Sequence, residues 1–348
     1  MKVCLYSGSL KLVEKSGVGH AVLHQKEMLE SVGVETTFRD APDAGIIHVN
    51  TVFPDSFLKA IAAHMEGKKV IYYGHSTMED FKHSFHGSDV FAPLFKKWIR
   101  VCYSRGDVII TPTEYSRNLL LSYGIQKPIF PLSNGIETER FQFSPQRRER
   151  FRRKYHIAEW EQAVLSVGHY IERKGILDFI SMARANPARR FFWFGYTNLK
   201  FVPKAVQRAI ENAPENLAFP GYVESEELCD AYCGCDLFQF MSYEETEGIV
   251  VLEALSCEIP VVIRDIPVYD GWLTDRENVY KAGDCEAFQR AMEGILSGTW
   301  PDLRKAGRKV AEQRDVGRMG EKLLAVYAQL TDPCATVAPA KMRETISQ

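Results

Sequence analysis

Two glutamates flank a glycine in the second half of the chain, in a segment suited to binding a phosphorylated ligand. The segment reads Tyr243-Glu-Glu-Thr-Glu-Gly-Ile-Val-Val-Leu-Glu253 and places Glu245 and Glu253 eight residues apart. An apolar run precedes it and another, at residues 260–263, follows it. The pattern therefore predicts a strand, a helix that begins near Gly248, and a second strand.

The start of this helix indicates the chemistry. Its first turn, at Gly248, Ile249 and Val250, presents unpaired backbone N–H groups and the positive end of the helix dipole to a phosphate. Open α/β sheets bind ligands beyond the carboxyl ends of their strands. Because carboxylates repel phosphate, we expect Glu245 and Glu253 to accept hydrogen bonds from hydroxyl groups. Phosphate and hydroxyl groups together indicate a sugar nucleotide.

Length and composition limit the class of protein. A chain of 348 residues is long enough for about two domains. The formal net charge of −2 argues against a nucleic-acid partner. The cluster Cys229, Cys233 and Cys235 has no histidine near it and favours buried thiols over zinc, and unpaired cysteines fit a reducing cytosol. The first residues read as a strand rather than a signal peptide, and no apolar run is long enough to span a bilayer.

Strand-like runs alternate with helical stretches in both halves of the chain, which predicts parallel sheets covered by helices on both faces. The runs are 3–6, 46–49, 70–73, 108–111, 129–132, 164–167, 191–194, 217–219, 237–240 and 261–263. The rhythm breaks between residues 134 and 162, where the basic run 147–154 is interpreted as a solvated helix face rather than an anion site. We predict an α/β fold of the GT-B layout, two Rossmann-like domains facing a central cleft, which other two-domain proteins share.

A resemblance narrows the chemistry. Glu245 and Glu253, followed by Ala254-Leu-Ser-Cys-Glu-Ile-Pro260, resemble the donor-site signature of family-4 retaining GT-B glycosyltransferases. The other matching segments, in chain order, are Ser16-Gly-Val-Gly19, Gly74-His75, Ser133-Asn-Gly-Ile136 and Val167-Gly-His-Tyr-Ile-Glu-Arg-Lys-Gly175. Within the family, Lys15-Ser-Gly-Val-Gly-His20 and Phe194-Gly-Tyr-Thr-Asn-Leu199 are similar to bacterial enzymes of glycolipid synthesis.

The resemblance implies domain roles and a set of site residues. It assigns residues 1–140 to acceptor binding and 141–310 to nucleotide-sugar binding, with a helix at 311–330 packing back on the first domain and a frayed tail at 331–348. The implied catalytic residues are His75, Glu245 and Lys174. The implied donor-binding residues are Gly17, Gly19, Arg173, Lys174, Glu245, Gly248, Ile249, Val250 and Glu253.

The resemblance implies a chemical role for each of these residues. Lys174, with Arg173, would neutralise the leaving nucleoside diphosphate as the glycosidic bond breaks. Glu253 would bind the ribose hydroxyls, Glu245 would lie by the donor hexose, and His75 would orient backbone or bind the sugar and acceptor. The chain has no Asp-x-Asp pair for a metal–diphosphate clamp, so we predict no metal and no cofactor. The resemblance implies a UDP-sugar as co-substrate.

Simpler interpretations stand beside these. Glu245 and Glu253 could be helix charges, His75 a structural histidine, and the Gly17–Gly19 pair a plain turn. Glu244 and Glu247 are interpreted as neighbours, although a substrate preference could reside at position 247, where the family often has an aromatic or small residue. One departure is His169, where the family commonly has arginine. If His169 is neutral, Lys174 and Arg173 bear more of the diphosphate charge.

The function implied is α-retaining transfer of a hexose, glucose or galactose, from a UDP-sugar to a diacylglycerol-based acceptor such as glucosyl-diacylglycerol. The alternatives are a soluble saccharide or protein acceptor, and a non-catalytic nucleotide-sugar-binding module. Residues 89–103 predict an amphipathic helix with Phe91, Leu94, Phe95, Trp98 and Cys102 on one stripe. Such a helix suits an anionic membrane surface, or else packs on the N-terminal sheet. We expect a cytoplasmic enzyme, peripheral at the inner face of the cell membrane.

Overall fold

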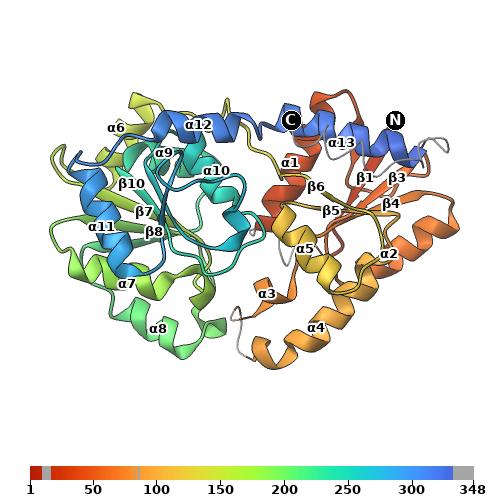
Figure 1. The fold of residues 1–348 in the computed structure, drawn as a ribbon, viewed down its shortest axis with the longest axis horizontal. Coiled ribbons are helices and arrows are strands. Elements are labelled where there is room, and N and C mark those ends of the chain that lie inside the picture. The colour runs from red at the N-terminus through yellow and green to blue at the C-terminus, as the bar shows by residue number, and fades with distance from the viewer. Residues whose placement is uncertain (10–16, 83, 85–86, 332–348) are drawn as a thin grey trace. The chain divides into compact units, whose positions relative to one another are not determined.

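Each half of the chain folds around its own parallel sheet (Figure 1). The structure, a computed structural model, describes residues 1–9, 17–82, 84 and 87–331. Within these residues, the strand order is β2-β1-β3-β4-β5-β6 in the first sheet and β12-β11-β10-β7-β8-β9 in the second. The predicted α/β class with two Rossmann-like parallel sheets is confirmed. Lys15, Ser16 and the tail from residue 332 lie outside the described residues.

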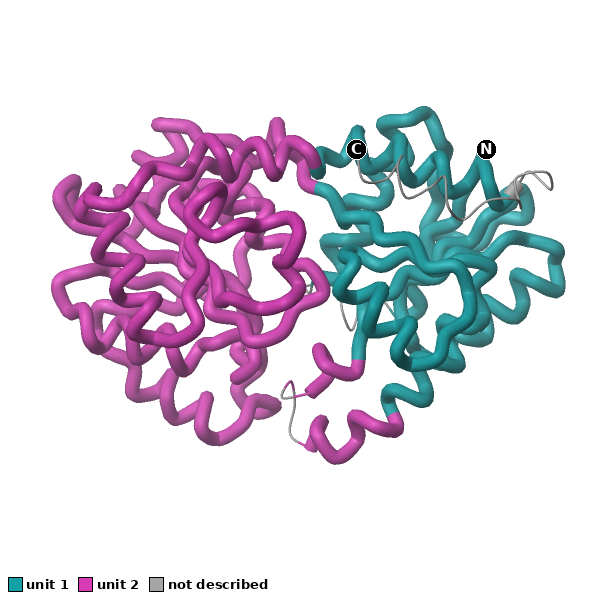
Figure 2. The backbone as a smooth tube through the Cα atoms, viewed as in Figure 1, with its two compact units in different colours: residues 1–77, 95–135, 314–348 teal, residues 78–94, 136–313 magenta. Residues whose placement is uncertain are grey.

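The chain divides into two compact units, shown in different colours in Figure 2. Unit 1 holds residues 1–77, 95–135 and the chain from 314 onward, and unit 2 holds residues 78–94 and 136–313. The division after residue 135 lies five residues before the predicted boundary. Residues 78–94, predicted in the first domain, group with unit 2, where Asp80 forms a 3.0 Å ion pair with Arg173.

Unit 1 combines short buried strands with helices from both ends of the chain. Its strands are β1 (Lys2–Tyr6), β2 (Glu35–Thr37), β3 (Ile46–Val49), β4 (Lys69–Tyr73), β5 (Val108–Thr111) and β6 (Ile129–Pro131). Its helices are α1 (Gly17–Ser31), α2 (Pro54–Met65), α5 (Glu114–Ser122), α13 (Val316–Thr331) and part of α4 (Ser88–Tyr103), which follows the one-turn α3 (Met78–Phe81). Helix α13 packs against α1, and its Leu323 and Val326 join the core of the first sheet.

Unit 2 is built in the same way. Its strands are β7 (Ala163–Val167), β8 (Arg190–Phe194), β9 (Leu217–Gly221), β10 (Leu237–Phe240), β11 (Val261–Arg264) and β12 (Tyr280–Ala282). Its helices are α3, the first part of α4, α6 (Pro145–Lys154), α7 (Ile176–Ala185), α8 (Lys204–Glu211), α9 (Ser225–Gly234), α10 (Ile249–Ser256), α11 (Cys285–Leu296) and α12 (Arg304–Glu312). Phe179 packs edge-on against Phe191 and Trp193 in its core, a geometry that aromatic rings favour.

The strand order of the second sheet determines where a ligand can bind. Strands β7 and β10 are neighbours, and the chain order runs outward from them in opposite directions. In such a sheet, the loops that follow the two central strands separate and leave a binding crevice at their carboxyl ends. These loops are residues 168–175 after β7 and 241–248 after β10, and they hold Arg173, Lys174 and Glu245.

Candidate active site

The loops after β7 and β10 are fastened to each other. Tyr243 donates its backbone N–H to the Arg173 carbonyl oxygen at 2.8 Å. Gly175 lies between the loops with a φ of +77°, and a Cβ there would lie 2.2 Å from the carbonyl oxygen of Met241. Only glycine allows both the left-handed backbone and this close approach. The loop after β7 is therefore held against the end of β10.

This packing brings two of the predicted catalytic residues together. Lys174 Nζ lies 2.5 Å from Glu245 Oε1, and their side chains are 16% and 6% exposed. Burial raises the pKa of Glu245, but the charges of Lys174 and Arg173 outweigh burial and hold that pKa below its ordinary value. Glu245 is consequently a carboxylate at neutral pH, and the ammonium group of Lys174 is positioned by it.

Arg173 has a more structural position than the sequence predicted. Its guanidinium donates to the carbonyl oxygen of Glu244 at 2.5 Å and forms the ion pair with Asp80 at 3.0 Å. It also donates to the hydroxyl of Ser84 at 3.3 Å. Arg173 thus holds the turn that carries Glu245, and part of its charge is already compensated by Asp80.

Helix α10 begins at the predicted residue. Gly248 caps it with a φ of +85°, and Ile249 and Val250 form its first turn. Glu253 lies one turn further along α10 and is only 2% exposed. The helix start and Glu245 therefore belong to the same loop, which places N–H donors and a carboxylate at the switch point of the sheet.

Glu253 is held by a residue that the sequence analysis did not identify. Tyr232 of α9, 1% exposed, donates its hydroxyl to Glu253 Oε2 at 2.8 Å. Burial raises the pKa of Glu253 to about 7, although the hydrogen bond from Tyr232 acts in the opposite direction. Donation from ribose hydroxyls to Glu253 would favour its carboxylate form.

Glu253→Gln is expected to reduce the pH dependence of the free energy of unfolding. Because the folded pKa of Glu253 lies above its ordinary value of 4.5, the stabilisation from its protonated form is complete below pH 4.5 and is lost as the pH rises through about 7. The loss should be on the order of 3 kcal/mol in the wild type. Urea denaturation at pH 5 and pH 8 measures it. Glu286→Gln, at a side chain 89% exposed, is the control, and an undiminished loss in Glu253→Gln would contradict the assignment.

The structure also places Glu247 and His169, whose roles the sequence left open. Glu247, interpreted as a neighbour of the site, is only 2% exposed and is therefore part of the interior of the loop. His169 donates from Nδ1 to the carbonyl oxygen of Tyr196, 3.0 Å away. Burial lowers the pKa of His169, so the side chain is neutral and the positive charges of this loop are those of Arg173 and Lys174.

Unit 1 holds the remaining predicted site residues. Gly17 begins α1 after β1 and is exposed, whereas Gly19 is buried in its first turn. His75 follows β4 and is 8% exposed, and its ring stacks on Tyr73 with centroids 4.9 Å apart. Burial lowers the pKa of His75 to about 3, so its imidazole is neutral. Its Nε2 atom lies 3.2 Å from Asn50 Oδ1.

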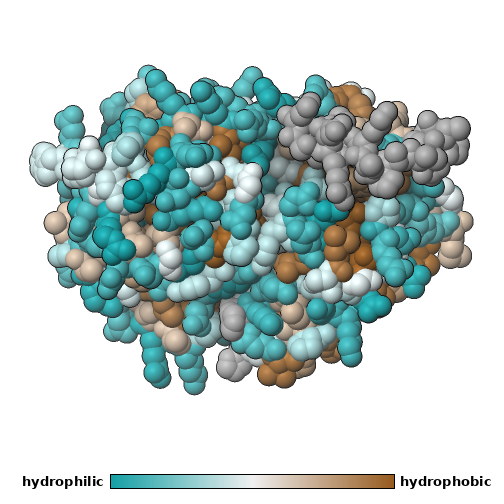
Figure 3. Space-filling model, in the orientation of Figure 1, coloured by the Kyte–Doolittle hydropathy of each residue, from teal (hydrophilic) through white to brown (hydrophobic). Residues whose placement is uncertain are grey.

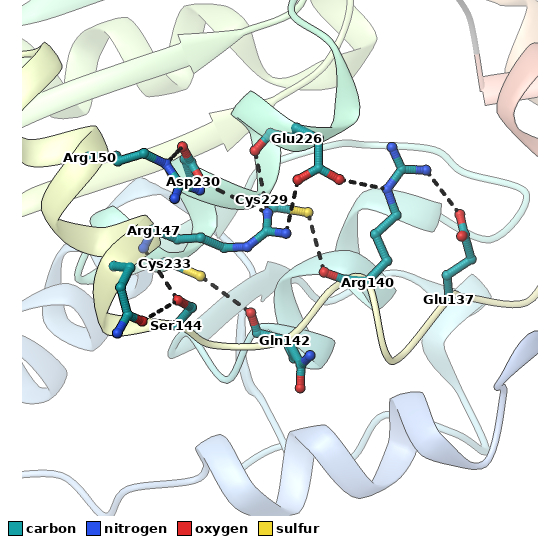
Figure 4. Close-up of polar contacts among 11 residues, drawn as sticks. Glu137, Arg140, Gln142, Ser144, Arg147, Arg150, Glu226, Cys229, Asp230 and Cys233 are labelled. Atoms are coloured by element: carbon teal, nitrogen blue, oxygen red, sulfur yellow. Dashed lines mark hydrogen bonds and ion pairs between the residues drawn. The ribbon is translucent and has the colours of Figure 1, made fainter.

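The basic run 147–154 is partly solvated, as predicted, and partly paired with acidic residues. It forms α6, whose arginines pair with the acidic residues of α9 (Figure 4). Arg147 lies 2.9 Å from Glu226, and Arg150 lies 2.7 Å from Asp230. These carboxylates neutralise the run and join the two helices. The nearby thiols of Cys229 and Cys233 are buried against backbone carbonyl oxygens, as the buried-thiol interpretation predicted.

A cavity of about 610 Å³ lies in unit 2 at the other ends of the strands. It is lined near the start of β10 and β11 by Asp236 and Val261, with Trp160 and Trp300. None of the predicted site residues lines it. The site is therefore assigned from the loops at the switch point and not from this cavity.

Comparison with known proteins accounts for these features. The family "Glycosyltransferase Family 4" matches residues 34–140, which include His75. The family "Glycosyl transferases group 1" matches residues 147–314, which include the two loops of unit 2 and helix α10. A processive diacylglycerol alpha-glucosyltransferase of Acholeplasma laidlawii is 38% identical over 331 residues, 95% of this chain and 98% of that protein.

Two further similarities extend this comparison. The alpha-galactosylglucosyldiacylglycerol synthase of Streptococcus pneumoniae is 27% identical over 65% of this chain and 62% of its own length. Sucrose-phosphate synthase of Thermosynechococcus elongatus superimposes with a TM-score of 0.79 at 16% identity, over 95% of this chain and 99% of that one. The structure of Anabaena HepE in complex with UDP-glucose superimposes with a TM-score of 0.76 at 16% identity, over 94% of this chain and 100% of that one. The chain belongs to the family-4 glycosyltransferases of GT-B fold.

Proposed function

We propose that this chain transfers a hexose from a UDP-sugar to a diacylglycerol-based glycolipid, with retention of the α configuration. The observation that carries the proposal is the 38% identity, over nearly the whole of both chains, to a diacylglycerol alpha-glucosyltransferase. The second relative is, by its name, a synthase of a glycosylated diacylglycerol. The UDP-glucose complex of Anabaena HepE supports a UDP-sugar as the donor.

The geometry of unit 2 fits the donor. In this proposal the N–H groups at the start of α10 and the ammonium of Lys174 receive the diphosphate, and Glu253 accepts from the ribose hydroxyls. Glu245 lies beside the hexose. As the glycosidic bond breaks, negative charge grows on the leaving phosphate and Lys174 stabilises it. The ion pair with Glu245 orients Lys174 at 2.5 Å before the donor arrives.

Metal independence is part of the proposal. It rests on positive charge supplied by the protein itself, from Lys174 and from the first turn of α10. The sequence has no Asp-x-Asp pair to hold a metal ion against the diphosphate. We expect the rate of UDP formation to be unchanged by EDTA. A rate that falls with EDTA and returns with Mg²⁺ or Mn²⁺ would exclude this part of the proposal.

Product analysis tests the transfer itself. The protein is incubated with UDP-glucose or UDP-galactose and with glucosyl-diacylglycerol in mixed vesicles. Mass spectrometry should show a lipid heavier by one hexose, and proton NMR of the new anomeric centre should show the α configuration. A product formed only on soluble saccharides or proteins would move the acceptor to the soluble class. Donor binding without any product would favour a non-catalytic binding module.

Helix α4 is the surface proposed to meet the membrane. No helix in the described ranges is both long and apolar enough to cross a bilayer. The predicted apolar stripe is split between two environments. Cys102 is buried and the Trp98 indole N–H donates to the Val52 carbonyl oxygen at 2.6 Å, whereas Phe91 and Leu94 are 61% and 64% exposed.

The exposed half of α4 combines apolar and basic groups. Val90, 80% exposed, extends the patch formed by Phe91 and Leu94, and Figure 3 shows hydrophobic surface at the lower edge of the view, where α4 begins in Figure 1. Lys97 and Arg100 are exposed on the same helix. Apolar side chains with adjacent basic groups suit an anionic membrane surface.

Phe91→Ser with Leu94→Ser is expected to weaken binding to anionic vesicles at least about tenfold. The two serines cannot provide the favourable free energy that Phe91 and Leu94 gain when they move from water into the membrane. Transfer to lipid in vesicles should fall with it, while transfer in detergent micelles should persist. Leu58→Ser with Met65→Ser, at side chains 62% and 84% exposed on α2, is the matched control. Equal vesicle binding by all three proteins would contradict this role for α4.

A further inference from the structure

A chain of buried polar side chains in unit 1 joins the C-terminal helix to His75. Tyr327 of α13 places its hydroxyl 2.7 Å from His48 Nε2 on β3. His48 Nδ1 lies 3.2 Å from Gln25 Oε1 on α1. Gln25 Nε2 donates to Asn50 Oδ1 at 2.7 Å, and Asn50 lies 3.2 Å from His75 Nε2. His75 is 8% exposed and the other four side chains are 1% exposed or less.

The protonation states of the two histidines determine which group donates and which accepts in each of these hydrogen bonds. Burial lowers the pKa of each imidazole to about 3, so each ring carries a single proton, with one donor and one acceptor nitrogen. When Tyr327 donates to His48 Nε2, the proton of His48 lies on Nδ1 and is donated to Gln25 Oε1. The amide of Gln25 then turns its NH₂ group toward Asn50.

The same logic fixes the proton of His75. Asn50 Oδ1 is an acceptor, so His75 Nε2, 3.2 Å away, donates to it. The competing contact, from Gln25 Nε2 to His75 Nε2, is longer at 3.4 Å. His75 Nδ1 is left with its lone pair, and no hydrogen bond to it is found among the described residues. Stacking on Tyr73, with an interplanar angle of 19°, fixes the plane of the ring.

We propose that Tyr327, acting through His48, Gln25 and Asn50, is a positioning residue that holds His75 as the Nε2–H tautomer. His75 Nδ1 is thereby kept as an acceptor for a hydroxyl group of the saccharide substrates. The part about the hydroxyl group rests on the proposed function, whereas the tautomer does not. Tyr327 is 279 residues from His48 along the sequence. In this proposal the C-terminal helix therefore influences His75 through the series of hydrogen bonds.

Nitrogen NMR of the full chain, with ¹⁵N-labelled histidines, reads the tautomer directly. The His75 signals are assigned by their absence in His75→Asn. The wild type should show a protonated Nε2 and an unprotonated Nδ1 for His75. Tyr327→Phe removes the hydroxyl that donates to His48, the first of this series of hydrogen bonds, so His75 should show a mixture of the two tautomers. An Nδ1–H tautomer in the wild type, or an unchanged tautomer in Tyr327→Phe, would overturn the proposal.

Kinetics and a matched control complete the test. Tyr327→Phe should lower kcat about tenfold, the value of roughly one hydrogen bond, with KM for the UDP-sugar changed less than about twofold. Tyr72→Phe removes another buried hydroxyl of unit 1, which donates to the Thr51 carbonyl oxygen at 2.8 Å, and should leave the His75 tautomer unchanged. If Tyr327→Phe does not fold, the wild-type tautomer still decides. The expected tautomers with undiminished turnover in His75→Asn would support the hydrogen-bond chain and refute the catalytic role of His75.

Discussion

Glu245→Gln is expected to lower kcat for hexose transfer by about 10²–10³-fold, because it removes a buried carboxylate from the position assigned to the reacting sugar. The affinity for UDP should stay the same or increase. In the wild type, Glu245 Oε1 lies 2.5 Å from Lys174 Nζ and neutralises part of its charge, and the variant releases that charge to the diphosphate. Steady-state UDP formation gives kcat, and calorimetry gives the affinity for UDP.

The control for this variant is the adjacent glutamate. Glu244 is half-buried, and the contact that ties it to Arg173 uses its backbone carbonyl oxygen, which Glu244→Gln preserves. Glu244→Gln should therefore keep kcat within about threefold of the wild type. A Glu245→Gln variant that turns over at the wild-type rate would remove Glu245 from the catalytic residues. Loss of UDP binding in it would indicate a structural role instead.

Lys174→Met is the second variant with a large expected effect, since it removes the cation nearest the predicted diphosphate site. We expect kcat to fall about 10²–10³-fold and UDP to bind at least about tenfold more weakly. The protein should also be destabilised by about 3–5 kcal/mol, because Glu245, 5% exposed, is left as a buried charge without its partner. Urea denaturation measures the stability and UDP formation measures the activity.

The double variant separates these two effects. Lys174→Met with Glu245→Gln removes both charges, so most of the stability lost in Lys174→Met should return while activity stays low. Lys204→Met, at an exposed lysine of α8, is the control and should change neither quantity. If the double variant is as unstable as Lys174→Met alone, the ion pair is not the source of the instability.

Most of the fold follows from apolar patterning. The ten strands predicted from the sequence are all present, because runs such as 70–73 and 261–263 are buried on both faces of a parallel sheet. The two strands that were not predicted, β2 (Glu35–Thr37) and β12 (Tyr280–Ala282), have three residues each and lie at sheet edges. Such strands are short and partly polar, so they leave no apolar run to detect.

Contacts within the site were predictable from the sequence only where the residues are neighbours along the chain. Gly248, Ile249 and Val250 are consecutive, and they start α10 as the pattern predicted. The contacts of Tyr232 with Glu253 and of Lys174 with Glu245 span 21 and 71 residues. They depend on how α9 and the loop after β7 pack, which the local sequence does not contain. The resemblance named Lys174 and Glu245, but their pairing required the structure.

The loops at the β7–β10 switch point are proposed to transfer a hexose from a UDP-sugar to a glycolipid. The most direct measurement is the initial rate of UDP release from UDP-glucose and UDP-galactose, with EDTA, in the presence and absence of glucosyl-diacylglycerol in anionic vesicles. We predict lipid-dependent UDP release by the wild type from one of the two donors, and its loss in Glu245→Gln. UDP release at the same rate with and without the lipid, or undiminished UDP release in Glu245→Gln, would contradict the proposed transfer.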